Sequence, residues 1–79
     1  MLEIILESYP EDNFLIATGF DDAVIGVDLV TMRLIYSVSE VISILMIDMS
    51  EEEAIEYFEF NVAGSYMGEN TPIWCYDNF

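Results

Sequence analysis

Cys75 is the only cysteine in this chain, and histidine is absent from it. The chain can therefore form no intramolecular disulfide, and it lacks the ligands of a structural zinc site of the Cys/His kind. Domains below about 80 residues often need such supports, because their cores bury little surface. We therefore expect residues 1–79 to form one domain that depends on its apolar core or on self-association.

Apolar residues make up 54% of the sequence, more than in an average soluble domain. This fraction predicts a folded core and argues against disorder, in spite of the high charge. No apolar run is long enough to cross a membrane, and residues 1–7 lack the basic start and the cleavage site of a signal peptide. We therefore expect a cytoplasmic protein without membrane contact, in which the single thiol stays reduced.

Three short segments have the β-branched and aromatic composition of strands, namely residues 23–27, 32–36 and 71–76. Four residues separate the first two segments, which predicts a hairpin. Because of Pro72, the third segment should either lie at a sheet edge or have Pro72 as the first residue of its strand. Residues 14–18 also have strand character, and residues 2–8 fit either a short helix or a strand that ends before Pro10.

Two helices are expected between the second and third strands. After N-cap candidates Ser37 and Ser39, apolar residues recur at the spacing of one helical face, at Val38, Val41, Ile42, Leu45 and Met46. The second helix begins with Ser50 and Glu53, which form a capping-box pattern. It is expected to run to about Ala63, with Gly64 at the C′ position and a buried stripe of Ala54, Ile55, Phe58 and Val62. These elements predict a small α+β domain in the order β-β-α-α-β, after a short N-terminal element. Its sheet is three-stranded and mostly antiparallel, with two helices packed on one face.

Charge is the most unusual property of the composition. Sixteen acidic residues stand against one basic residue, Arg33, for a formal net charge of −15. Such a field attracts basic surfaces and repels phosphate groups. Because nucleic-acid binding depends on Lys and Arg that neutralise phosphates, we expect no direct contact with DNA or RNA. The alternative explanation is that the acidity serves only solubility or adaptation to salt.

Catalysis is not expected of this chain. General acid–base catalysis near neutral pH falls mostly to histidine, lysine or a carboxylate with a shifted pKa, and the first two are absent. A pair of catalytic carboxylates needs a substrate cleft, for which 79 residues leave little room. Cys75 has no basic neighbour in sequence to stabilise its thiolate. We therefore expect no enzyme, no catalytic residue and no cofactor.

Two groups of oxygen-bearing side chains are close in sequence: Asp48, Ser50, Glu52 and Glu53, and Asp21 with Asp22. Neither group follows the calcium-loop pattern of alternating ligands, a central glycine and a bidentate glutamate. We therefore expect loose association with divalent cations and no dedicated metal site.

The acids of the second helix form a stripe. Glu52, Glu56 and Glu59 lie at i, i+4 and i+7, opposite the apolar face, and Glu40, Asp48 and Glu51 extend the stripe. Residues at i and i+4 are about 6 Å apart along a helix, which is similar to the spacing of phosphates along one nucleic-acid strand. This pattern predicts a nucleic-acid mimic that binds a basic groove with fast, salt-sensitive association. The alternative is an ordinary solvated helix face, although such a face normally carries lysine partners.

Aromatic residues of the second helix indicate a second kind of contact. Tyr57, Phe58 and Phe60 cannot all face the core from one helix, so Tyr57 or Phe60 should be exposed. The first helix is apolar on more than one side, because Ile44 and Ile47 lie outside its main stripe. An exposed aromatic residue beside such a helix is typical of an association surface. We therefore include Tyr57 among the binding residues and expect a homo-oligomer.

Four segments carry a resemblance to a known family: GFDDAVIGV at 19–27, RLIYS at 33–37, EEAIEYFEFNVAG at 52–64 and YMGENTPIW at 66–74. Across about residues 19–77 the chain resembles a family of small proteins from tailed-phage genomes that has no established activity. The resemblance implies a phage gene product in the host cytoplasm and assigns no catalytic residue. The expected partner is then the basic surface of a host protein such as a nuclease or a restriction or CRISPR component. The alternative is a structural or assembly module, a small homodimer whose acidity only maintains solubility.

Overall fold

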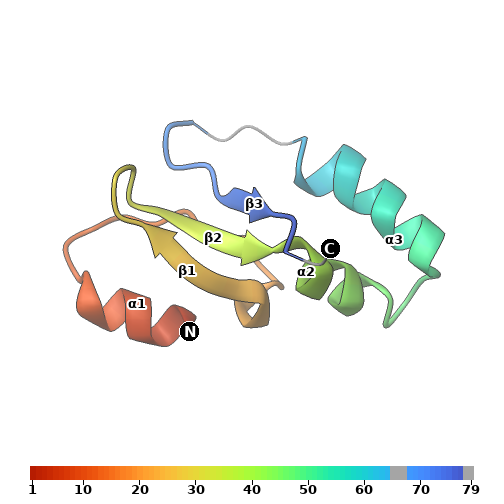
Figure 1. Ribbon diagram of the computed structural model, residues 1–79, viewed down its shortest axis with the longest axis horizontal. Helices are drawn as coiled ribbons and strands as arrows, with labels where there is room; N and C mark the ends of the chain where they lie inside the picture. Colours follow the sequence, from red (N-terminus) through yellow and green to blue (C-terminus); the bar gives the residue numbers. More distant parts are fainter. Residues whose placement is uncertain (65–67, 78–79) are drawn as a thin grey trace.

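The computed structural model describes residues 1–64 and 68–77 and confirms the α+β class (Figure 1). A 3-10 turn, Asp21–Ala23, precedes the sheet, and a π-helical turn, Phe58–Val62, continues the third helix. The remaining elements, in chain order, are α1 Leu2–Ser8, β1 Val24–Asp28, β2 Arg33–Ser37, α2 Val38–Leu45, α3 Glu51–Tyr57 and β3 Ile73–Cys75. No helix among the described residues is long and apolar enough to cross a membrane.

The sheet is mixed, and its strand order is β1-β2-β3. β1 and β2 form the predicted antiparallel hairpin, with Asp28 opposite Arg33, whereas β3 pairs with β2 in parallel, with Trp74 opposite Tyr36. The prediction of a mostly antiparallel sheet was therefore only half right. The chain leaves β2 directly into α2 and returns to the sheet after α3, and a long helical crossover of this kind brings a strand back parallel to its neighbour. β3 lies at the sheet edge and follows Pro72, as the proline indicated.

The N-terminal segment forms helix α1, which packs on β1 through the buried side chains of Leu2 and Ile5. Residues 14–18, which had strand character, form no strand. The backbone N–H of Ala17 donates to the Tyr36 hydroxyl at 2.8 Å, so this donor bonds a side chain in place of a neighbouring strand. The segment is thereby held against the sheet without joining it.

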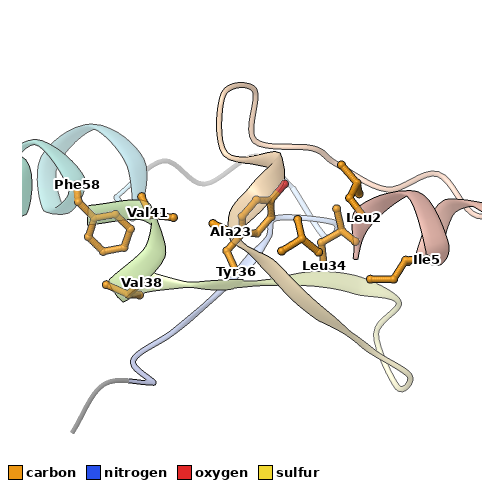
Figure 2. Packing of buried hydrophobic residues seen from close by; sticks show 9 residues of the cluster. Leu2, Ile5, Ala23, Leu34, Tyr36, Val38, Val41 and Phe58 are labelled. Atoms are coloured by element: carbon orange, nitrogen blue, oxygen red, sulfur yellow. The ribbon is translucent and has the colours of Figure 1, made fainter. Parts of the chain in front are cut away.

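The core is one continuous row of apolar side chains along the 38 Å long axis of the molecule. Figure 2 shows it from Leu2 and Ile5 on α1, past Leu34 and Tyr36 on β2, to Phe58. Trp74 connects Tyr36 and Phe58 within this row, because its ring lies 5.0 Å from that of Tyr36 and 5.5 Å from that of Phe58, edge-on to the latter. These aromatic contacts join β2, β3 and the π-helical turn.

Both helix starts agree with the sequence patterns. The Ser37 hydroxyl accepts from the Glu40 N–H at 3.2 Å. Ser50 and Glu53 form the full capping box, in which the Ser50 hydroxyl accepts from the Glu53 N–H at 3.2 Å and the Glu53 carboxylate accepts from the Ser50 N–H at 3.3 Å.

The end of the second predicted helix differs from expectation. Its last turn is π-helical, closed by the Ala63 N–H bonding the Phe58 carbonyl at 2.8 Å. A Cβ at Gly64 would lie 3.2 Å from the Glu59 carbonyl oxygen. Glycine is therefore favoured at this position because the backbone passes close to the π turn.

The packing of the two helices also differs from the prediction that both lie on one sheet face. α2 packs against β2, whereas α3 packs on α2, and the π turn that continues α3 reaches the sheet through the contact of Phe58 with Trp74. Figure 1 shows α3 at the opposite end of the molecule from α1. The buried stripe of α3 is narrower than expected, since Ala54 and Phe58 are buried while Ile55 is 42% exposed. A helix with so narrow an apolar stripe has little surface with which to cover a sheet.

Candidate binding surface

The densest group of acids lies on α3 and the π turn. Five of the sixteen acids of the chain fall within residues 51–59, and all five are exposed. They are Glu51, Glu52, Glu53, Glu56 and Glu59. Arg33, the only basic residue of the sequence, is on β2, and its guanidinium donates to the Thr31 hydroxyl at 3.1 Å and the Thr71 carbonyl at 3.2 Å. The acids of α3 therefore have no basic partner on their own helix.

The predicted acidic stripe is divided by the way α3 packs on α2. Glu51 and Glu59 line a groove between the two helices, whereas Glu52 and Glu56 lie outside it. Successive helical residues are rotated by about 100°, so positions 51, 55 and 59 share one side of the helix and positions 52 and 56 share the next. The structure thus assigns the predicted stripe to two adjoining surfaces.

Glu40 and Asp48, the other two acids of the predicted stripe, are exposed but do not line this groove. Glu40 is in the first turn of α2, where its backbone N–H is bonded to the cap residue Ser37. Asp48 lies in the turn after α2, where its N–H donates to the Leu45 carbonyl at 3.2 Å. Both stay candidates for electrostatic contact with a basic surface, away from the groove.

The groove between the helices, which we call the α2–α3 groove, has a volume of about 380 Å³. Its apolar lining comes from Val38, Ile42 and Met46 of the α2 side and from Ile55 and Phe58 of the α3 side. Three carboxylates also line it, those of Glu51, Glu59 and Asp77. Sequence reasoning missed Asp77, because only the tertiary structure brings the residues after β3 beside α2. It placed Ile55 in a buried stripe, whereas Ile55 lines the groove and is 42% exposed.

Hydrogen bonds from two serines favour the charged form of Asp77 at this groove. The Ser39 hydroxyl donates to its carboxylate at 3.1 Å, and the Ser39 and Ser37 hydroxyls share a hydrogen bond of 3.0 Å. Hydrogen bonding by Ser37, followed by that of Ser39, lowers the pKa of the Asp77 carboxyl from its ordinary value. The negative charge of Asp77 therefore lies beside the first turn of α2.

Tyr57 lines a different hollow, of about 410 Å³, on the other side of α3. This hollow is bounded by residues 15–18, Leu45, Pro72 and Trp74. Tyr57 is 44% exposed and Phe60 is 76% exposed. The sequence predicted that one of these two aromatic residues is exposed, and the structure exposes both. The indole N–H of Trp74 is buried, with no hydrogen-bond acceptor in the described structure.

Acids also occur far from α3. Glu3 and Glu7 are exposed on α1, at the other end of the long axis (Figure 1). Asp28 at the hairpin accepts from the Val30 N–H at 2.9 Å, which is the main reason that its pKa is lowered. The charge of the molecule is thus distributed over both ends, and α3 carries its highest local density.

Cys75 is half-buried on β3. Within residues 1–64 and 68–77, no three Cys, Asp or Glu side chains lie close enough together to hold a metal ion.

Comparison of the chain with protein-family models, curated proteins and solved structures found no match. The resemblance to the tailed-phage family therefore stays a prediction.

Proposed function

We propose that this protein acts by binding, without catalysis, and that the acids of α3 bind the basic surface of another protein. The observation that carries the proposal is the exposure of Glu52 and Glu56 on a capped helix, in a chain whose only basic residue lies elsewhere. Charges without an internal partner keep their full attraction for a complementary surface. Such complementarity mainly accelerates association and makes it sensitive to salt.

The proposed partner surface is one that binds nucleic acid in a host protein, such as a nuclease or a restriction or CRISPR component. Glu52 and Glu56 are about 6 Å apart along the axis of α3, a separation comparable with that of neighbouring phosphates. Bound in this way, the protein acts as a nucleic-acid mimic and inhibitor in the host cytoplasm. The resemblance to phage proteins supports this setting.

A structural role as a small homodimer is the second candidate. Phe60 is 76% exposed and Ile47 is 78% exposed, and apolar side chains of this size favour burial in a contact between proteins. In this case the acidity only maintains solubility. The formal charge of −15 on each copy opposes such an association.

The two candidates are separated by capture from a bacterial lysate at low and high salt. We expect the wild-type protein to retain a nucleic-acid enzyme at low salt, and we expect added DNA to displace it. The double variant Glu52→Gln/Glu56→Gln should retain about tenfold less of this enzyme, since the loss of charge contacts at an interface weakens binding by about this factor. The variant Glu3→Gln/Glu7→Gln, which removes the same charge from α1, is the matched control.

Two outcomes contradict the proposal. One is equal loss in both double variants, because this indicates a dependence on total charge alone. The other is the absence of any DNA-displaced partner together with a homodimer in sedimentation equilibrium, which supports the structural module.

A further inference from the structure

The α2–α3 groove combines an apolar lining with a negative border. Inside it, Phe58 and Val38 are buried, while Ile55 and Met46 are 42% and 41% exposed. Apolar surface left in water is a source of binding free energy when a partner covers it. The groove therefore offers an apolar contact to a partner, in contrast to the charged outer face with Glu52 and Glu56.

The carboxylates lie on two sides of this lining. Glu51 and Glu59 stand on the α3 side, eight residues apart, or about two helical turns. Asp77 stands on the α2 side, since it accepts a hydrogen bond from Ser39 in the first turn of that helix. An occupant of the groove therefore meets negative charge on both flanks.

Charge complementarity selects the occupant. A second copy of this chain is disfavoured, because each copy carries a formal charge of −15 and its one basic residue, Arg33, is bonded to Thr31 and Thr71. An anionic ligand is repelled for the same reason. An apolar segment flanked by Lys and Arg satisfies both the lining and the border.

We propose that the α2–α3 groove binds a cationic amphipathic helix of a partner protein. This inference rests on the proposed function and specifies the partner: the basic surface includes a helix with apolar residues at i, i+3 or i+4 and i+7 and with basic residues beside them. A volume of about 380 Å³ holds a few side chains and not a whole helix. The partner helix therefore lies across the groove, inserts its apolar side chains and pairs its basic residues with Glu51, Glu59 and Asp77.

The test uses a synthetic helical peptide of leucine and lysine, with its leucines at i, i+3, i+4 and i+7. A peptide of the same composition, with the leucines distributed around the helix, is the control for nonspecific attraction to an acidic protein. Binding is followed by fluorescence anisotropy of a labelled peptide at physiological salt. We expect the amphipathic peptide to bind about tenfold more tightly than the control, as the alignment of apolar anchors in helix-in-groove binding requires.

Variants then locate the contact. Ile55→Ser should remove the preference for the amphipathic peptide. We expect this variant to fold, because Ile55 is already 42% exposed, and circular dichroism checks its folding. Glu51→Gln/Glu59→Gln should weaken binding about fivefold to tenfold and reduce its salt dependence. Glu3→Gln/Glu7→Gln removes the same charge from α1, away from the groove, and should have at most a twofold effect.

Equal affinity for the two peptides, or equal losses in the two double variants, would overturn the groove as a binding site. Either result leaves the proposed function unaffected. The proposed function is tested separately, by capture of a partner from a lysate and by the loss of this capture in Glu52→Gln/Glu56→Gln. A dimer in sedimentation equilibrium that Ile55→Ser dissociates also overturns the proposal, since the occupant is then a second copy.

Discussion

The Tyr36 hydroxyl accepts a hydrogen bond of 2.8 Å from the backbone N–H of Ala17, nineteen residues earlier in the chain. Tyr36 is fully buried at the centre of the core, on β2. Its ring packs on Trp74 of β3, and its hydroxyl holds the irregular segment before the sheet. One side chain therefore connects three parts of a molecule that has neither a disulfide nor, among its described residues, a metal cluster.

Replacing Tyr36 by Phe keeps the ring and removes this hydrogen bond. The part-buried N–H of Ala17 then loses its acceptor, and we expect the free energy of unfolding to fall by about 1–2 kcal/mol. Urea denaturation followed by circular dichroism measures the change. A loss below about 0.3 kcal/mol would show that water replaces the hydroxyl at no cost.

Alkaline pH should destabilise the wild-type protein through the same side chain. Burial raises the pKa of Tyr36 above its ordinary value near 10. Because the folded pKa is the higher one, the stability contribution is complete below the unfolded pKa and is lost as pH rises through the folded pKa. We expect unfolding free energies measured from pH 8 upwards to fall more steeply above about pH 10 for wild type than for Tyr36→Phe. Parallel curves would contradict this assignment.

The capping box at the start of α3 should contribute measurably to stability. Ser50→Ala removes the hydroxyl that accepts from the Glu53 N–H, and we expect a loss of about 1 kcal/mol in urea denaturation. Ser43→Ala is the matched control. Ser43 is an exposed serine within α2 that donates only to the Ser39 carbonyl, so its replacement should change stability by less than about 0.5 kcal/mol.

The hairpin between β1 and β2 contains a residue in the left-handed region, Met32, with a φ of 53°. This conformation costs a non-glycine residue about 1 kcal/mol, and asparagine tolerates it better. We therefore expect Met32→Asn to raise the melting temperature, with a gain of roughly 0.5 kcal/mol. Met32→Ala retains the strained conformation and should give no gain; equal gains in both variants would point to loss of the methionine side chain as the cause.

Salt should stabilise this protein. At about 10 mM ionic strength the Debye length is about 30 Å, close to the 38 Å long axis, so repulsion acts between acids across the whole molecule. Raising NaCl to about 0.5 M screens this repulsion and should raise stability by on the order of 1 kcal/mol. Glu52→Gln/Glu56→Gln should show a smaller increase in thermal unfolding experiments. A melting temperature that falls with salt would contradict the dominance of repulsion.

Local patterns in the sequence determined the α+β class, the hairpin and the starts of both main helices. Ser50 and Glu53 are three residues apart, and their reciprocal hydrogen bonds need no distant partner. The exposure of one of Tyr57 and Phe60 also follows from local geometry, since Phe58 occupies the buried side of the same helix, whereas only the structure shows that both are exposed. Features of this kind depend on residues within one or two turns of each other.

Only the tertiary structure decided the direction of β3, the π turn and the division of the acidic stripe. β3 is parallel to β2 because of where the chain re-enters the sheet after α3, which no local pattern encodes. The packing of α3 on α2 places Glu51 and Glu59 on the same groove as Asp77 and leaves Glu52 and Glu56 outside it. Helical spacing shows which acids share a face, but the side that meets a neighbouring element depends on burial of Phe58 against Trp74.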